Sequence, residues 1–388
     1  MRIGIVAPAP WSNSGYGVQC SYLLRTLRAL GHEAACFAFT GLSGSPLVWQ
    51  GSLVYPKLFH EMGQDMAMHA RHFGADIVIP LMDIWHIQHA AWDGIPLCPY
   101  FPIDHEPLSP HIARIIAGCH TPIVYSQFGQ RMCKDAGLDV AYIPCAVDTD
   151  IYAPIDRTEA REALGWPQDR YIVGMVQANA GRPSRKAFEP QLRAFKWFQN
   201  QHPDALLYLH TFVNAGREID GDNILGMLAS LDLQLGKDVL IPDQYAYTVG
   251  IAPQRLALCY NAMNVLLQVT SGEGFGVPLI EAQAAGTPVI CGDWTSMPEL
   301  CFAGWTVPRL TAEVYGREAY DDELWGTLEG YKVQPRASAI VEQLEASWQG
   351  RGWSDLRFHA RDGALAFGVG AVADHYWRPM LEGIEGRL

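Results

Sequence analysis

The sequence predicts an α/β protein built from two parallel sheets, each covered by helices. Short β-branched apolar runs alternate along the chain with stretches of helical periodicity, which is the pattern of parallel sheets with crossover helices. Two halves of the chain each open with a strand, a glycine-containing loop and a helix. The length of 388 residues allows two compact cores, since a domain typically takes about 100–200 residues.

The first half opens with residues 3–7, an apolar run that predicts a strand. A loop containing Gly15 and Gly17 follows, and residues 18–30 then predict a helix that ends at Gly31, because glycine is favoured just after a helix. The further strands and helices expected in this half are residues 34–39, 62–73, 76–80, 107–117, 122–125, 128–136 and 140–143.

A segment bounded by Pro144 and Pro154 has no helical or strand periodicity and is interpreted as a link between domains. We therefore expect a first domain over residues 1–150 and a second over 151–370, with 371–388 as a C-terminal helix that crosses back to the first domain. The elements expected in the second half are residues 171–177, 187–201, 205–210, 239–241, 254–262, 265–269, 276–285, 288–291, 337–348 and 354–367.

Composition excludes several classes of protein. Charged residues make up 18% of the chain and hydrophobic residues 49%, which excludes a disordered polar tail. A net charge of −13 disfavours a uniformly basic surface for nucleic acid or anionic lipid. Nine scattered cysteines without a Cys-x-x-Cys pair indicate reduced thiols, and no run approaches the roughly 20 apolar residues of a membrane span. We expect a cytoplasmic protein without stable membrane insertion.

The most informative stretch is residues 271–282, Ser-Gly-Glu-Gly-Phe-Gly-Val-Pro-Leu-Ile-Glu-Ala, which follows the apolar run 265–269. Pro278 suits the first position of a helix, whose free N–H groups and dipole favour an anion such as a diphosphate. Glu273 and Glu281 are expected to face one crevice, Glu273 outward from the loop tip and Glu281 from the first turn of the helix. Carboxylates accept hydrogen bonds from vicinal diols, although a structural turn with a helix cap would also explain the glycines.

The whole string resembles the Glu-x7-Glu signature of retaining glycosyltransferase family 4. Residues 285–290, Ala-Gly-Thr-Pro-Val-Ile, extend the resemblance, and residues 15–17, 31–33, 144–154 and 256–264 resemble further family segments in the expected order. The resemblance covers roughly residues 1–310. It implies the GT-B architecture, in which two Rossmann-like domains face each other across a cleft, with the acceptor on the N-terminal side and the nucleotide-sugar donor on the C-terminal side.

The resemblance also implies roles for individual residues. Glu281 would hold the ribose hydroxyls of the donor, and Glu273 would contact the transferred sugar. The remaining donor-binding positions that it implies are the glycine-loop residues Gly15 and Gly17 and the backbone of Gly274, Phe275, Gly276 and Val277.

A basic pair after the first strand of the second domain normally neutralises the diphosphate in this family. Lys186 matches the family lysine, but the position of the family arginine is occupied by Gly181, so that either Arg182 or Arg185 must serve. Cations at a helix N-terminus oppose the helix dipole, and a bound anion explains Arg185 and Lys186 better than an exposed helix start does.

In the first domain, Asp104 and His105 follow an apolar strand. The family commonly has a histidine there, so His105 is a candidate catalytic residue and Asp104 a candidate for donor binding, with a structurally satisfied loop histidine as the alternative. Asp83 and Ser126 also follow strands, and either could be a helix cap instead.

No metal ion and no other cofactor is expected, the nucleotide sugar being a substrate. Asp148 with Asp150, and Asp220 with Asp222, match the Asp-x-Asp metal motif of the other glycosyltransferase architecture, but the first pair lies in the link and the second before a helix. His86 and His89 have a metal-like spacing on one helix face without a third ligand nearby.

The resulting hypothesis is a retaining, metal-independent transfer of a sugar from a nucleotide sugar, UDP-linked more often than GDP-linked, to a hydroxyl of a glycan, lipid, protein or modified nucleic acid. One alternative is a nucleotide-sugar epimerase of the same architecture, against which the Glu-x7-Glu block and the following Ala-Gly-Thr-Pro-Val count. The other is a non-catalytic carbohydrate or nucleotide-sugar binding protein, against which the two acids and Lys186 count.

Overall fold

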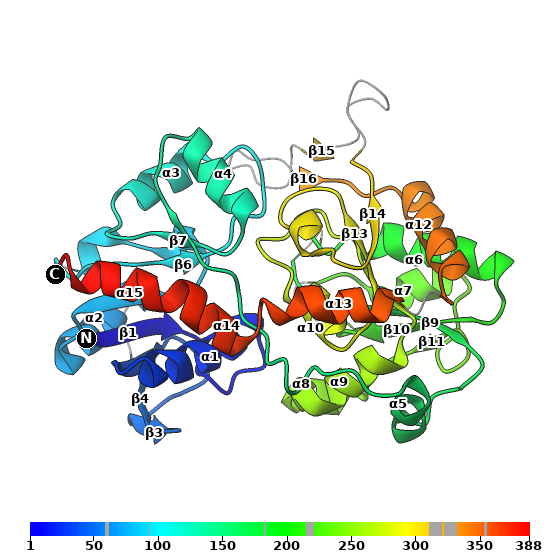
Figure 1. Ribbon diagram of the computed structural model, residues 1–388, viewed down its shortest axis with the longest axis horizontal. Helices are drawn as coiled ribbons and strands as arrows, with labels where there is room; N and C mark the ends of the chain where they lie inside the picture. The colour runs from blue at the N-terminus through cyan, green and yellow to red at the C-terminus, as the bar shows by residue number, and fades with distance from the viewer. Residues whose placement is uncertain are drawn as a thin grey trace. The chain divides into compact units, whose positions relative to one another are not determined.

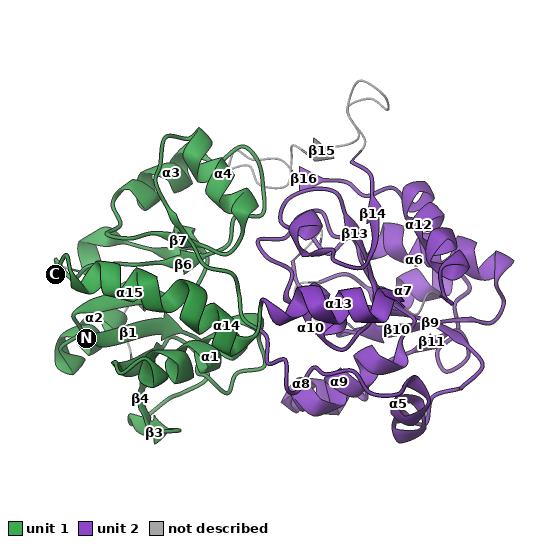
Figure 2. Ribbon diagram, viewed as in Figure 1, with its two compact units in different colours: residues 1–146, 327–330, 367–388 green, residues 147–326, 331–366 purple. Residues whose placement is uncertain are grey.

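A computed structural model describes residues 1–58, 62–92, 94–181, 184–214, 221–309, 320–321, 332–352 and 355–388 (Figure 1). The chain forms two compact units. The first contains Met1–Ala146 and Phe367–Leu388, and the second contains Val147–Gly326 and Tyr331–Ala366 (Figure 2).

The first unit is built on a five-stranded sheet of order β3-β4-β2-β1-β5, continued by a three-stranded sheet of order β6-β7-β8. All neighbouring strands are parallel except β3 and β4, which form an antiparallel hairpin. An isolated bridge between Leu81 and Tyr100 joins the two sheets. The strands are β1 (Arg2–Ala7), β2 (Glu33–Ala38), β3 (Leu47–Trp49), β4 (Ser52–Tyr55), β5 (Ile77–Pro80), β6 (Tyr100–Phe101), β7 (Ile123–Val124) and β8 (Ala141–Tyr142).

Helix α1 (Gly15–Ala29) packs on β1 and β2 of this unit. It begins at Gly15 because the side chain of Ser14 caps it, accepting a hydrogen bond of 3.1 Å from the amide of Gly17. The expected glycine loop is therefore wrong in extent, since Gly15 and Gly17 lie in the first helical turn. The other helices of the unit are α2 (Met62–Phe73), α3 (Pro110–Ala117), α4 (Gln127–Asp135), α14 (Val369–Val372) and α15 (Arg378–Glu385), with short turns η1 (Ile84–His86), η2 (His89–Ala91) and η5 (Ala373–Trp377).

The C-terminal segment completes the core of the first unit. The rings of Trp377 and Tyr100 meet edge to face with centroids 5.2 Å apart, and both side chains are buried. Phe37 forms similar contacts with Tyr55 and Phe73 at 5.5 and 6.1 Å. Such aromatic pairs add to the stabilisation that comes from burial of apolar area.

The second unit is built on a six-stranded, fully parallel sheet of order β11-β10-β9-β12-β13-β14. Every residue of the four strands β9, β10, β12 and β13 is buried, which explains why their sequences are continuous apolar runs and not alternating ones. The strands are β9 (Tyr171–Val176), β10 (Ala205–His210), β11 (Val239–Leu240), β12 (Val265–Gln268), β13 (Val289–Gly292) and β14 (Gly304–Val307); β15 (Tyr320–Asp321) and β16 (Lys332–Val333) pair separately.

Helices pack in pairs around this sheet, α5 with α9, α6 with α12 and α10 with α13. Arg161 on α5 is buried and donates to the carbonyl oxygens of Ala262 and Gln168 and to the side chain of Asn264, which fixes α5 to the end of α9. The helices are α5 (Arg157–Leu164), α6 (Phe188–Gln201), α7 (Ile224–Ser230), α8 (Gln244–Val249), α9 (Pro253–Ala262), α10 (Val277–Ala284), η3 (Met297–Leu300), α12 (Ala337–Gln349) and α13 (Asp355–Leu365).

Differences from the expected elements have local causes. The hairpin β3–β4 lies in a region where the sequence analysis identified no element between residues 39 and 62, because its strands are short. The helix expected from residue 107 begins only at Pro110, since the side chain of Ser109 caps it at the amide of His111. Within the ranges given above, no helix has both the length and the apolar character needed to cross a bilayer.

Candidate functional site

The strand order of the second unit reverses between β9 and β12. From β9 the sheet extends through β10 to β11, and from β12 it extends the other way through β13 to β14. In open parallel sheets, ligands bind outside the carboxyl ends of the strands at such a reversal. The loops that follow β9 and β12 therefore define the candidate site.

These two loops meet through a buried ion cluster. The ammonium of Lys186, after β9, lies 2.5 Å from Oε1 of Glu273, and a guanidinium nitrogen of Arg185 lies 3.0 Å from Oε2. The side chain of Glu273 is only 6% exposed and that of Lys186 13%. The cluster therefore brings two cationic side chains to the loops at the carboxyl ends of β9 and β12.

The cluster keeps Glu273 ionised. Burial alone would raise the pKa of Glu273, but the charges of Lys186 and Arg185, together with their hydrogen bonds, outweigh burial and hold the pKa at about 2. The expectation that Glu273 points outward from the loop tip is wrong. Its carboxylate turns inward because it pairs with the two cations.

Hydrogen bonds to backbone groups hold the two loops together. Gln191 on α6 donates to the carbonyl oxygens of Lys186 and Ala187 and accepts from the amide of Val269. The amide of Ser271 donates to the carbonyl oxygen of Arg185 at 2.8 Å. The cations are thus placed by α6 and by the loop after β12 together.

Two residues other than glycine adopt left-handed backbone conformations beside the cluster. Ala187, which precedes α6, has φ of 49°, and Thr295 has φ of 54°. The hydroxyl of Thr295 accepts a hydrogen bond from the amide of Glu273 at 3.1 Å. Such conformations are uncommon for residues with a side chain and concentrate at functional sites.

Helix α10 begins at the mouth of the same loop. Gly276 caps it with φ of 112°, a conformation that favours glycine, and Pro278 occupies its second position, one later than expected. The hydroxyl of Ser296 donates to the carbonyl oxygens of Glu273 and Phe275 at 2.7 Å, which fixes the loop before the helix. The sequence-predicted residues Gly274, Phe275, Gly276 and Val277 all lie in this loop and first turn.

Glu281, the fifth residue of α10, lies in a different environment from Glu273. Its carboxylate accepts a hydrogen bond of 2.9 Å from the hydroxyl of Tyr260 and is buried. Burial raises the pKa of Glu281 to about 7, while hydrogen bonds from Tyr260 and Tyr152 oppose the rise. Two carboxyl groups with pKa values pushed so far apart are suited to different roles.

The remaining candidate cation of the second unit, Arg182, lies outside the described residues. Lys186 and Arg185 precede α6 and do not form its first turn, because the helix begins at Phe188. Arg185, one of the two arginines considered from the sequence, lies at Glu273.

In the first unit, His105 and Asp104 lie side by side. Nδ1 of His105 is 3.2 Å from a carboxylate oxygen of Asp104, and the histidine is 2% exposed. Its Nε2 is buried and has no hydrogen-bond partner in the part of the chain that the structure describes. That finding disfavours a structurally satisfied loop histidine.

The other first-unit candidates have structural partners. The hydroxyl of Ser126 caps α4 at the amide of Gly129, 3.0 Å away, and Asp83 accepts a hydrogen bond from the hydroxyl of Tyr16. Gly15 and Gly17 lie in α1, where a Cβ at Gly17 would come 2.5 Å from the carbonyl oxygen of Ser12. Close backbone approach thus explains the glycine at position 17.

The motifs set aside as metal sites have local explanations. A carboxylate oxygen of Asp148 accepts from the amides of Asp150 and Ile151, and Asp220 lies outside the described residues. The expected single helix for His86 and His89 is wrong, because the two residues lie in the separate turns η1 and η2. Across the residues listed for the structure above, no three His, Cys, Asp or Glu side chains gather as a metal site.

Sequence reasoning missed several polar residues of the site. Tyr260 and Tyr152 were not assigned a role toward Glu281, and Thr295 and Ser296 none toward the Glu273 loop. Gln177, directly after β9, has both amide atoms buried without a hydrogen-bond partner among the described residues. A carboxamide at the carboxyl end of a predicted strand was the one signal that could have drawn attention to Gln177.

Comparison with known proteins was made for sequence and for fold. Residues 156–304 match the family model described as glycosyl transferases group 1. A D-inositol 3-phosphate glycosyltransferase of Stackebrandtia nassauensis is 31% identical over 152 residues, which cover 39% of this chain and 32% of that protein. One from Rhodococcus erythropolis is 34% identical over 149 residues, covering 38% and 31%. The chain thus spans about a third of the length of these curated relatives.

Solved structures resemble the whole chain. A sucrose-phosphate synthase of Thermosynechococcus elongatus superposes with a TM-score of 0.77 at 18% identity, and the match covers 100% of both chains. The HepE protein of Anabaena, solved in complex with UDP-glucose, gives 0.67 at 15% identity, again over 100% of both. At such identity the likeness bears on the fold alone, and it confirms the predicted fold class of two Rossmann-like α/β domains.

Proposed function

We propose that this chain is a group 1 glycosyl transferase that moves a sugar from a nucleoside diphosphate sugar to a hydroxyl group of an acceptor. The match of residues 156–304 to the group 1 family model supports the proposal.

The observation that carries the proposal is the buried cluster of Glu273, Lys186 and Arg185 at the strand-order reversal. Its two cations lie in the loops beside the N-terminus of α10, where the positive end of the helix dipole also favours an anion. Both features favour a diphosphate. A carboxylate held ionised next to that position can accept hydrogen bonds from sugar hydroxyls.

In the proposed mechanism, Lys186 and Arg185 neutralise the charge that develops on the departing diphosphate, aided by the amides at the start of α10. Glu273 orients the transferred sugar, and Glu281 holds the ribose hydroxyls. The acceptor oxygen attacks on the face from which the diphosphate leaves, so that the anomeric configuration is retained and no enzyme nucleophile is needed. Because side chains and amides supply the positive charge, the reaction proceeds without a metal ion or other cofactor.

We assign the acceptor to the first unit, with His105 and Asp104 as its polar groups. The unsatisfied Nε2 of His105 supports this assignment, because it offers a buried proton donor or acceptor to a bound ligand. Because Nδ1 of His105 faces the carboxylate of Asp104, the tautomer of His105 that carries a proton on Nδ1 is favoured.

UDP is the favoured nucleotide because the Anabaena relative in fold was solved with UDP-glucose and with UDP. The acceptor is a hydroxyl of a glycan, lipid, protein or modified nucleic acid. The curated relatives are named for D-inositol 3-phosphate, and their match covers about a third of each.

The test is a donor screen followed by product analysis. UDP-glucose is expected to raise the melting temperature more than GDP-mannose does, and transfer or slow hydrolysis should release UDP, seen by mass spectrometry, in the presence of EDTA. The Glu281→Ala variant, which should lose donor binding, is the control. Donor recovered as an epimer would identify an epimerase, binding without turnover a non-catalytic protein, and absence of binding to any nucleotide sugar would reject the proposal.

A further inference from the structure

Several arginines gather in the second unit at the amino ends of the strands, whereas the Glu273 cluster lies at their carboxyl ends. A pocket of about 100 Å³ is lined there by Arg157, Arg351 and Arg357 together with Trp305 and Pro288. Pro288 directly precedes β13, and Trp305 is the second residue of β14, so the pocket lies at the amino ends of the strands. The length of a strand, at roughly 3.3 Å per residue, separates this pocket from Glu273 and Lys186.

Arg157 makes no hydrogen bond and no ion pair with the residues that the structure describes. Its Nε is buried without a hydrogen-bond partner among them. Leaving the buried Nε–H donor without an acceptor is costly. Arg157 also lies at the first position of α5, where a cation is opposed by the helix dipole.

The other arginines increase this excess of positive charge. Arg357 makes one hydrogen bond, to the carbonyl oxygen of Ile155 at 3.0 Å, and Arg351 donates to the carbonyl of Trp348. Burial, together with the charges of Arg357 and Arg161, lowers the pKa of Arg157 to about 10. Two groups that repel each other in this way would both gain from an anion placed between them.

The charge of the nearby Asp156 opposes the lowering of the pKa of both Arg157 and Arg357, but among the described residues its carboxylate forms no hydrogen bond with either of them. Asp156 caps α5, and a carboxylate oxygen accepts from the amides of Thr158 and Glu159. By contrast, Arg161 and Arg361 each make three hydrogen bonds to backbone carbonyls or side chains, which is the arrangement of a structural arginine. The donors of Arg157 and Arg357 therefore remain available in a way that those of their neighbours do not.

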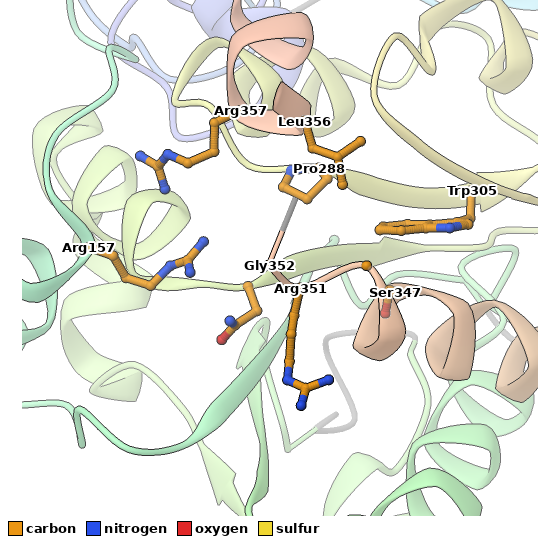
Figure 3. A pocket seen from close by; sticks show the side chains of 10 residues that line it. Arg157, Pro288, Trp305, Ser347, Arg351, Gly352, Leu356 and Arg357 are labelled. Carbon is orange, nitrogen blue, oxygen red and sulfur yellow. The ribbon is translucent and has the colours of Figure 1, made fainter. Parts of the chain in front are cut away.

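The shape of the pocket fits a compact anion with an apolar attachment. Figure 3 shows the guanidinium groups of Arg157 and Arg357 on one side of the pocket and the ring of Trp305 on the other, with Pro288 and Leu356 between them. About 100 Å³ corresponds to roughly three water molecules, which suits one tetrahedral anion. Arginine pairs favour phosphate because its oxygens accept two parallel N–H bonds.

We propose that Arg157 and Arg357 form a second anion site, separate from the donor site, which binds a phosphoryl group, either as free phosphate or as part of a small organic phosphate whose carbon atoms face Trp305. The site is independent of the proposed transfer reaction, because none of its residues belongs to the Glu273 cluster.

The test measures binding of inorganic phosphate by calorimetry and by thermal shift, at constant ionic strength adjusted with chloride. Wild-type protein should bind phosphate, and Arg157→Met or Arg357→Met should weaken binding by at least about tenfold, since a hydrogen bond to a charged group contributes that much. Arg193→Met is the matched control, because Arg193 is an exposed arginine that pairs with Glu189 on one helix. Glucose 6-phosphate in place of inorganic phosphate tests whether the site binds a small organic phosphate. Tighter binding of glucose 6-phosphate is expected if its carbon atoms contact Trp305.

Two further readouts separate binding from a purely structural role. Without phosphate, Arg157→Met should melt no lower than wild type, because it removes an unpaired cation; a clear fall in melting temperature would show a structural arginine and overturn the proposal. Lys186→Met should retain phosphate binding. Loss of phosphate binding in Lys186→Met, with retention in Arg157→Met, would place the phosphate in the donor site and would also overturn it.

Discussion

The contrast between Glu281 and Glu273 predicts that donor binding depends on pH in a range where few carboxyl groups titrate. Glu281 must be ionised to accept hydrogen bonds from both ribose hydroxyls, and burial raises its pKa to about 7. At that pKa, roughly a tenth of the molecules carry an ionised Glu281 at pH 6 and roughly nine tenths at pH 8. Donor affinity should therefore increase about tenfold between these pH values.

The measurement is calorimetric titration with UDP-glucose from pH 5.5 to 8.5. A nucleotide sugar is the suitable probe because both of its phosphates are diesters, whereas the terminal phosphate of free UDP would itself titrate near pH 6. Glu273, with its pKa held at about 2, stays ionised throughout and adds no slope.

Tyr260 offers a variant that moves the midpoint without removing the carboxylate. Its hydroxyl lowers the pKa of Glu281, so Tyr260→Phe should shift the midpoint of the affinity curve to higher pH. Tyr171→Phe is the matched control, because that hydroxyl bonds to Ser347 at the other end of the sheet. Glu281→Gln should bind weakly at every pH, and a slope unchanged from wild type in that variant would refute the reasoning.

Three other predictions concern charge and stability. Glu273→Gln should lower the free energy of unfolding at pH 7 by about 3 kcal/mol, because a pKa depressed from 4.5 to about 2 stabilises the folded state above the unfolded pKa. That difference should disappear as the pH falls from 4.5 through 2, and urea titrations of both proteins would contradict the expectation if it stayed constant. Lys186→Met should lower turnover about 100- to 1000-fold while circular dichroism stays native, and near-normal kcat would remove Lys186 from the mechanism. Arg161→Met should cost about 2–4 kcal/mol in urea titrations, since it removes three hydrogen bonds and deprives the buried carbonyl oxygen of Ala262 of this donor; a cost as small as that of the more exposed Arg170→Met would show that these contacts contribute little.

The sequence predicted the fold class and several positions of the candidate site because these depend on local pattern. A buried parallel strand has a continuous apolar run as its sequence, and three glycines before Pro278 indicate a loop that leads into a helix. Lys186 and Glu273 were predicted by their place after β9 and β12, but their contact with each other was not, because the two loops are 87 residues apart in the sequence.

The inward orientation of the Glu273 side chain could not be predicted from the local sequence pattern. A glutamate between two glycines is expected to be exposed, but ion pairs with the loop after β9 hold its carboxylate inside. Tyr260 was likewise visible as part of a helix, yet its hydroxyl reaches Glu281 through the packing of α9 against α10. Residue roles that arise from contacts between distant segments needed the tertiary structure.

The contact of Trp377 with Tyr100 has a consequence for synthesis on the ribosome. The first unit is encoded by both ends of the chain, so its hydrophobic core stays open at Tyr100 until the segment that holds Trp377 has emerged. The second unit is encoded between them and is nearly complete by then. We therefore expect the second unit to reach its native packing first, while residues 1–146 complete their core only after the segment that holds Trp377 has been made.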